Sequence, residues 1–443
     1  MEKHEEIFKH YGIQIPDIML PKKNTAMGKW AVIACDQYTS QPEYWASAAK
    51  LTAGYPSTLN LIFPECYLDD GDEDERIELI NSTMLDYINQ GVLADPEKGF
   101  ILLKRDTPKT KNRWGLMTAL DLEHYDFSKN SQSLIRATEG TILERIPPRV
   151  RIRENARLEL PHIMVLIDDA EKSIIEPLAE LKDSLEKVYD FDLMMDSGHL
   201  TGYRVNSKEI LSNLAAALEN LGSSDKLKKH YNSENAFLFA MGDGNHSLAT
   251  AKTIWENYKK EHADEPGLMS HPSRWALVEL VNIYSEGIEF EAIHRAIFET
   301  NPEHFFESLS KDNQFIIKTT KTLDEMINEV NNAGDKQICG YSCDSEYGLI
   351  EALKPTSSII AGTIQNFIDN YLDKYEGTVD YIHGVDITDN IGRKPGNIGI
   401  FLPSISKDTF FQTVIDDGAF PRKTFSMGEA FEKRFYVESR LIK

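Results

Sequence analysis

The stretch Ala236-Phe237-Leu238-Phe239-Ala240-Met241-Gly242-Asp243-Gly244-Asn245-His246-Ser247 decides the fold of this chain. Its first six residues are apolar, which indicates a buried β-strand. A loop framed by two glycines follows at once. From about Ser247 to His262 the apolar residues recur at helical spacing, at positions 248, 251, 255 and 258. The segment therefore predicts a strand, a tight loop and a helix in succession.

The residue types in this loop suit a bound phosphate. Gly242 and Gly244 allow a close approach of a ligand to the main chain, and the first turn of a helix offers unpaired N–H groups. Asp243 could bind Mg²⁺ or accept a proton, His246 could donate to a phosphate oxygen, and Ser247 could cap the helix or contact the ligand. The loop is neither a Walker A motif nor a G-x-G-x-x-G fingerprint. A tight turn that binds nothing, with Asp243 as turn former and Ser247 as N-cap, explains the same residues.

The rest of the chain alternates between strand and helix patterns, which predicts a mixed α/β fold. One apolar run, Trp30–Cys35, delivers Asp36 to a loop. Further strands are expected at 57–63, 99–104, 115–122, 162–167 and 275–283, and helices at 170–189 and 207–221. We expect three regions with soft boundaries: 1–165, 166–300 and 301–443.

The net charge of the chain limits its partners. It has 443 residues, a formal charge of −23 and a pI of about 5.0, so nucleic acid and anionic membranes are poor default partners. One basic stretch, Glu139–Arg157, stands out in this acidic protein and could hold a phosphate ligand. It contains Arg145, Arg149, Arg151, Arg153 and Arg157.

The cysteine content and the apolar runs indicate a cytoplasmic protein. The four cysteines are too few for a disulfide framework in a chain of this length. Residues 1–9 are charged and show no secretory signal. No apolar run approaches the roughly 18 residues of a membrane span.

The loop resembles the Asp-Gly-His-His-Arg loop of domain-of-unknown-function family 1015. That family loop is in turn similar to the phosphate-binding box of ParB/sulfiredoxin-like proteins, which include free-serine kinases. Other segments resemble the family in the same order along the chain: Ala34–Tyr38, Arg136–Thr141, Ile293–Arg295, Tyr381–Gly384 and Pro421–Phe425. The resemblance implies a ParB/sulfiredoxin-like nucleotide-binding core with additional α/β elements.

Two positions depart from the family loop. Asn245 replaces its first histidine, and Ser247 replaces its arginine. Asn245 can form hydrogen bonds but cannot act as an acid or a base. Since the arginine would clamp a phosphate, another cation must take its place; the candidates are Arg149, Arg151, Arg153, Arg295 and Lys423.

The resemblance implies an enzyme that uses ATP and Mg²⁺ to phosphorylate a small hydroxyl compound, with free L-serine the first guess. Such transfer depends on positioning and charge neutralisation. Asp243 would bind Mg²⁺ or orient the attacking hydroxyl, and Asp36 or Glu139 would be the general base. Phosphates would be held by Gly242, Gly244, Asn245, His246 and Ser247. His294 and Arg295 would stabilise charge or bind the carboxylate of the substrate.

Other functions are open at this point. The chain could bind a nucleotide as a regulatory switch without efficient turnover, which would suit the loss of the loop arginine. A metal-dependent hydrolase could use Asp36, Asp243, His246 and His294, although no H-x-H or H-E-x-x-H spacing supports it. The oligomeric state is also open, so the partners expected are a nucleotide and a small-molecule substrate.

Overall fold

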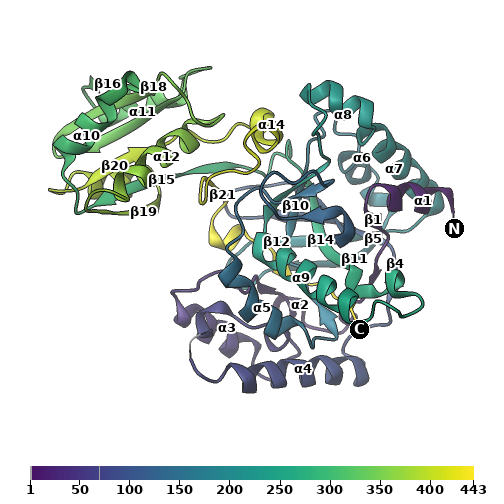
Figure 1. The fold of residues 1–443 in the computed structure, drawn as a ribbon. Helices are drawn as coiled ribbons and strands as arrows, with labels where there is room; N and C mark the ends of the chain where they lie inside the picture. The colour runs from purple at the N-terminus through teal and green to yellow at the C-terminus, as the bar shows by residue number, and fades with distance from the viewer. Residues whose placement is uncertain (1, 69) are drawn as a thin grey trace. The chain divides into compact units, whose positions relative to one another are not determined.

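The computed structural model describes residues 2–68 and 70–443, and the chain divides into two compact units (Figure 1). The first unit comprises residues 1–289 and 428–443, and the second comprises 290–427. These limits differ from the boundaries expected at 165 and 300. Val165 lies inside a central strand of the first unit, and the strand Phe290–Phe298 belongs wholly to the second. The second unit is thus an insertion in the chain of the first.

A mixed sheet forms the centre of the first unit. Within the described residues it has ten strands, in the order β11-β12-β5-β6-β14-β10-β13-β8-β7, with β1 paired to β6. The bounds are β1 Ile13–Gln14, β5 Phe100–Asp106, β6 Arg113–Asp121, β7 Tyr125–Asp126, β8 Ile135–Arg136, β10 Met164–Ile167, β11 Glu186–Asp192, β12 His199–Val205, β13 Phe239–Asp243 and β14 Trp275–Asn282. β10 runs parallel to β14 and antiparallel to β13, so the mixed α/β class expected from the sequence is confirmed.

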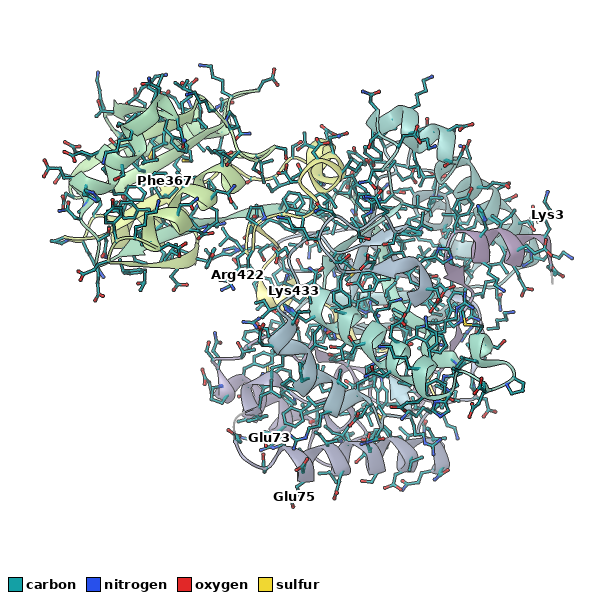
Figure 2. All side chains as sticks on the ribbon, viewed as in Figure 1. Lys3, Glu73, Glu75, Phe367, Arg422 and Lys433 are labelled. Atoms are coloured by element: carbon teal, nitrogen blue, oxygen red, sulfur yellow. The ribbon has the colours of Figure 1, made fainter. Side chains whose placement is uncertain are left out.

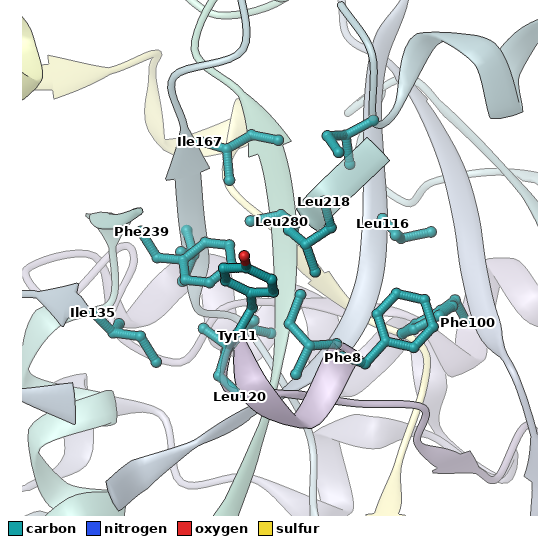
Figure 3. Packing of buried hydrophobic residues seen from close by; sticks show 14 of the residues in the cluster. Phe8, Tyr11, Phe100, Leu116, Leu120, Ile135, Ile167, Leu218, Phe239 and Leu280 are labelled. Atoms are coloured by element: carbon teal, nitrogen blue, oxygen red, sulfur yellow. The ribbon is translucent and has the colours of Figure 1, made fainter. Parts of the chain in front are cut away.

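Both faces of this sheet are buried, because successive side chains of a strand point to opposite faces. In β5, Leu102 belongs to one hydrophobic cluster and its neighbours Ile101 and Leu103 belong to another. Figure 3 shows the first cluster, in which Phe8 and Tyr11 pack against strand residues such as Leu120. The near-continuous apolar runs seen in the sequence follow from this two-sided burial.

Helices cover the two faces. α1 (Lys3–His10) packs on α7 (Lys208–Leu221), and α5 (Ile146–Arg153) packs on α9 (Asn245–Glu261). The remaining helices of the unit are α2 Met27–Trp30, α3 Pro42–Thr52, α4 Glu73–Asn89, α6 Glu176–Glu180 and α8 Ser224–Tyr231. Ser207 caps α7, since its hydroxyl accepts the N–H of Ile210 at 3.3 Å, as the sequence predicted.

Two expected elements are wrong. Within 170–189 the short helix α6 and a 3₁₀ turn, η5 (Lys182–Ser184), form. The chain then continues as β11, because pairing with β12 overrides the helical spacing of the apolar residues. The strand expected at 57–63 is a 3₁₀ turn, η1 (Thr58–Leu61). There the Ser57 hydroxyl accepts the N–H of Leu59, a local hydrogen bond that competes with strand pairing.

The last part of the chain returns to the first unit. β22 (Phe435–Tyr436) pairs with β3 (Val32–Ile33), and β23 (Arg440–Leu441) pairs with β9 (Leu158–Glu159). Arg434, which is buried, forms ion pairs with Glu279 at 2.6 Å and with Glu438, and donates to the carbonyl oxygen of Pro161 at 3.0 Å. These contacts hold the backbone of the neighbouring residues, Lys433 and Phe435, in place.

The second unit is built around a smaller sheet in the order β16-β18-β17-β20-β15-β19, with β21 paired to β15. The strand bounds are β15 Phe290–Phe298, β16 Phe315–Thr320, β17 Ile338–Cys343, β18 Glu346–Ala352, β19 Thr378–His383, β20 Ile398–Phe401 and β21 Phe425–Met427. The helices are α10 Pro302–Ser310, α11 Leu323–Asn331, α12 Ile360–Leu372, α13 Val385–Gly392 and α14 Lys407–Asp417. Phe290 is the register partner of Met427, so the first and last strands of this unit pair.

The four cysteines are free thiols, in agreement with the absence of a disulfide framework expected from the sequence. Among the helices in the described part of the chain, none combines the length and apolar composition needed to cross a bilayer.

Candidate functional site

A left-handed glycine turns the chain from β13 into α9. Gly244 has φ +83°, and a Cβ atom there would lie 3.1 Å from Cα of Ile163. The Asp243 carboxylate closes the turn by accepting the N–H of Gly244 at 3.0 Å. The helix therefore begins at Asn245, before the expected start at Ser247, and Gly244 is its N-cap. The prediction that Ser247 caps the helix is wrong.

The N-terminus of α9 offers hydrogen-bond donors. Gly244 has no side chain, and no side-chain cap bonds to this end among the described residues. The first-turn N–H groups and the helix dipole favour an anion here. In addition, Oδ1 of Asn245 is buried and has no hydrogen-bond partner within residues 2–68 and 70–443. A buried acceptor without a partner is costly, which is consistent with a hydrogen-bond donor, such as a hydroxyl group of a ligand, that bonds to it.

Lys433 brings a positive charge to the loop. Its Nζ lies 3.2 Å from Oδ2 of Asp243, and only 13% of the Lys433 side chain is exposed. Its position next to Arg434 explains how it is held, because the ion pairs of Arg434 anchor that part of the chain. Lys433 (Figure 2) was not among the cations predicted from the sequence, yet it contacts Asp243.

A hydrogen-bonded chain orients the Ser247 hydroxyl. The N–H of Cys35 donates to the hydroxyl of Tyr436 at 3.2 Å, so that hydroxyl can still donate its own hydrogen to Nδ1 of His162 at 2.7 Å. Nε2 of His162 then carries the ring hydrogen and donates to Oγ of Ser247 at 2.9 Å. In this arrangement the hydrogen of the Ser247 hydroxyl can donate to a ligand.

Asp36 lies on the same side of the loop, following β3 as predicted. Its Oδ2 is 4.0 Å from Nε2 of His162, and its Oδ1 accepts from Gln37 at 3.0 Å. Burial would raise the pKa of Asp36, but the hydrogen bond from Gln37 and the charge of Lys433 help to lower it below its usual value. The carboxylate is therefore ionised at neutral pH.

Arg149, one of the predicted cations, reaches the site from α5. It pairs with Glu65 at 2.5 Å, and both side chains are about four-fifths buried, with 15% and 16% exposed. Burial raises the pKa of Glu65, and the charge of Arg149 opposes this effect. Glu65 thus holds Arg149 beside the N-terminus of α9.

His246 is neutral at neutral pH. Its pKa is lowered to about 4, first by burial and then by the charges of Arg149 and Arg145. Its Nε2 accepts the N–H of Ile142 at 3.3 Å. Because an uncharged ring cannot add positive charge, the remaining role for His246 at a phosphate is to donate through Nδ1.

Two other predicted residues of the first unit are placed as follows. Arg151 is exposed and pairs with Asp74, so it points to solvent. Glu139 is half-buried in the segment between β8 and the 3₁₀ turn η4 (Leu143–Arg145). Its role as a general base stays a prediction.

Arg153, a further candidate cation of the first unit, pairs with Glu159 at 2.6 Å. His294, Arg295 and Lys423 lie in the second unit. Arg295 is fully buried and donates to Gln365 at 2.8 Å and to the carbonyl oxygens of Ile293 and Lys423. Nδ1 of His294 accepts the N–H of Leu402 at 3.1 Å, and burial, followed by the Arg295 charge, lowers the pKa of His294 to about 4. Both side chains thus form hydrogen bonds with the backbone of their own unit. Their binding to a nucleotide or substrate stays a prediction.

The acidic residues fit Mg²⁺ by their chemistry. Carboxylate oxygens are its preferred protein donors, and it commonly uses one or two of them together with phosphate oxygens and water. Asp243 contacts Lys433, whose charge also acts on Asp36, so the two carboxylates share one electrostatic environment. Asp243 would be the residue that holds the ion.

Four residues of the site were missed by the sequence interpretation: Glu65, His162, Lys433 and Tyr436. Each is far in sequence from the loop residue or arginine it serves, so no local spacing marks it. His162 is the first residue of the strand expected at 162–167 and lies two residues before β10, and a polar residue at the end of a buried strand was the available signal.

Comparisons with known proteins place the chain in context. The family model described as "Protein of unknown function (DUF1015)" matches residues 17–371. A search of curated proteins finds no match to this sequence.

Several solved structures are similar to the chain at low identity. A mutant free serine kinase in complex with AMP has a TM-score of 0.39 and 9% identity, over 75% of this chain and 95% of that one. A mutant of the same enzyme in complex with ADP has a TM-score of 0.38 and 8% identity, over the same shares. A conserved hypothetical protein from Pyrococcus furiosus has a TM-score of 0.36 and 8% identity, over 74% and 95%. All these TM-scores are below 0.5, so the chemistry of the site rests on this chain's own contacts.

Proposed function

The chain belongs to the DUF1015 family of proteins of unknown function, and on that premise we propose that it binds a nucleotide at the N-terminus of α9 and transfers its terminal phosphoryl group to a small hydroxyl compound. The observation that carries this proposal is the uncapped helix end behind Gly244, with the charge of Lys433 beside it. Anions bind at such helix ends through N–H groups and the dipole.

The cations present can replace the missing loop arginine. Lys433 contacts Asp243, and the charge of Arg149 acts on His246 in the first turn of α9. Ser247, which stands at the position of the family arginine, would donate its hydroxyl hydrogen to a phosphate oxygen while His162 holds its Oγ. Positioning and charge neutralisation of this kind are what phosphoryl transfer requires.

The carboxylates supply the remaining roles. Asp36, ionised because of its lowered pKa, would accept a hydrogen bond from the acceptor hydroxyl and take its proton as the oxygen–phosphorus bond forms and the nucleoside diphosphate leaves. Asp243 would hold Mg²⁺, whose chemistry is to neutralise charge on the phosphates. Free L-serine is the first acceptor to test, as the motif resemblance implies.

The test measures ADP release from ATP and Mg²⁺ with and without L-serine, for the wild type, Asp243→Ala and the control Asp183→Ala. Asp183 is an exposed aspartate, with 89% of its side chain accessible. If L-serine is the acceptor, ADP release depends on serine and phosphoserine forms, and both are lost only in Asp243→Ala. Nucleotide binding without turnover on L-serine would refute that acceptor, and no nucleotide binding at all would refute the site.

A second candidate function is a nucleotide-dependent switch without efficient turnover. Ser247 in place of the family arginine and the uncharged His246 favour it, because both reduce the positive charge available to a transferring phosphoryl group. A conformational change on ATP binding, measured by hydrogen exchange, with no phosphorylated product from any alcohol offered, would support the switch over the kinase.

A further inference from the structure

A cavity of about 130 Å³ lies in the first unit next to Ser247. Its apolar wall comes from η1 and the loop after it, from α4 and from the end of α5. The apolar lining residues are Cys35, Leu61, Ile62, Phe63, Leu68, Ile80, Met84, Ile152, Ala156, Leu158 and Leu160. Most of these residues belong to one hydrophobic cluster, so the cavity is an apolar pocket in a packed core, partly open to solvent.

The polar lining residues include those of the proposed site. Ser247, His162 and Tyr436, the members of the hydrogen-bonded chain, line it together with the Glu65–Arg149 ion pair. The cavity is therefore amphipathic: donors and a charged pair lie beside the start of α9, and aliphatic and aromatic side chains enclose the rest.

The size of the cavity indicates what fits in it. Packed cores contain few voids larger than a water molecule. An apolar cavity of about 150 Å³ stays dry and binds benzene, so a cavity of about 130 Å³ suits an apolar group slightly smaller than or similar to a benzene ring. Water would find few polar partners against the leucine, isoleucine and phenylalanine wall.

We propose that this cavity binds the apolar tail of the phosphoryl acceptor, so that the acceptor is a small alcohol with a tail of about six carbon atoms. Its hydroxyl would lie beside Ser247 and Asp36, and its tail would contact Phe63, Met84 and Ala156. The identification of this ligand as the acceptor rests on the proposed function; the binding of an apolar tail does not. Free L-serine has no such tail and would leave the cavity unfilled.

Binding is tested first, without nucleotide or turnover. Benzyl alcohol and 1-hexanol serve as probes, with L-serine and glycerol for comparison, and saturation-transfer NMR reports binding to the full chain. We expect the first two to bind and the second two to bind at least about tenfold more weakly, since each buried carbon adds to affinity.

Two substitutions change the shape of the cavity in opposite directions. Ala156→Leu fills it and should weaken binding of 1-hexanol at least about tenfold. Met84→Ala enlarges it and should shift the preference toward 1-octanol. Ala216→Leu, at an exposed position of α7, is the matched control and should change neither affinity. A shift toward the longer alcohol requires a folded protein, so Met84→Ala separates loss of the cavity from loss of the fold.

The outcomes distinguish this inference from the proposed function. If the alcohols bind as expected while ATP does not bind, the nucleotide proposal fails and the apolar site stands. If Ala156→Leu weakens ATP binding and leaves 1-hexanol unaffected, the cavity holds the nucleobase and the inference is wrong. Equal binding of 1-hexanol to the wild type and Ala156→Leu, with no response of Met84→Ala to chain length, would also overturn it.

Discussion

In the proposed site, the charge of Lys433 takes the place of the absent loop arginine. Its removal in Lys433→Met should weaken nucleotide binding about tenfold or more, because a hydrogen bond to a charged group contributes about 1.5–3 kcal/mol. Titration with a fluorescent nucleotide measures the change. Lys433→Arg should retain most of the affinity, and Lys187→Met, which removes a lysine with 51% of its side chain exposed, should retain all of it. Equal affinities for the wild type and Lys433→Met would exclude Lys433 from the site.

Gly244 is required by its backbone conformation and by its neighbour. Gly244→Ala places a side chain at φ +83° and 3.1 Å from Ile163. The left-handed conformation alone costs about 1–2 kcal/mol, and the contact adds to this. Gly267→Ala is the matched control, since Gly267 has φ +85° and open space around its Cβ position. Urea unfolding should show a larger loss of stability for Gly244→Ala, and equal losses would mean that the contact with Ile163 has no effect.

The sequence identifies candidate site residues where a reactive or flexible residue type directly follows a predicted strand. Gly244 and Asp36 follow strands as expected, whereas Asp243, expected in the loop, is the last residue of β13 and pairs with Met164. Tyr436 and Lys433 could not be found, because their partners lie hundreds of residues earlier in the chain. Contacts of that kind depend on the return of the C-terminal segment to β3, which leaves no periodic signal in the sequence.

Among the elements, the junction of β15 and β20 should be sensitive to acid. His294 on β15 accepts the N–H of Leu402 directly after β20, and its pKa is lowered from 6.5 to about 4. The unfolded chain then binds a proton more readily than the folded one. The contribution of neutral His294 to the free energy of unfolding is therefore fully present above pH 6.5 and is lost as the pH decreases toward 4. The full effect is up to about 3 kcal/mol.

His294→Asn tests this expectation, because the amide oxygen can accept the same N–H without taking up a proton. Urea unfolding of the full chain at several pH values should show a shallower loss of stability for this variant than for the wild type. His246 titrates over the same range and contributes to both curves, so the difference between them reports His294. His10→Asn, an exposed position, should follow the wild type.

Helices were predicted well where their own residues show both an apolar face at helical spacing and a capping residue. α7 has a buried face and the Ser207 cap, and it forms as expected. The helix expected at 170–189 shows the limit of this reasoning, since β11 forms there through its pairing with β12. Helical spacing in a sequence is a local property, whereas strand pairing is decided by a neighbour elsewhere in the chain.

For the whole molecule, the insertion of the second unit predicts that the two units can be separated. Phe290 and Met427 are register partners, and the Cα atoms of such a pair are about 4.5–5.5 Å apart. A short Gly-Ser linker from Glu289 to Gly428 should therefore replace residues 290–427 and leave the first unit folded. Circular dichroism and cooperative unfolding of this shortened chain, and of the fragment 290–427, measure the outcome. Unfolding of the shortened chain without cooperativity would mean that the first unit depends on the second.

The return of residues 428–443 to the first unit also has a consequence for synthesis on the ribosome. The early part of the chain, with β3, His162 and the loop at Gly244, is made long before Lys433, Arg434 and Tyr436 emerge. Until then Glu279 lacks its arginine and His162 lacks the hydroxyl that sets its tautomer. The proposed ligand site is therefore complete only after the last residues of the chain have emerged. A chain that ends before residue 434 lacks Arg434 and Tyr436, so its site is incomplete.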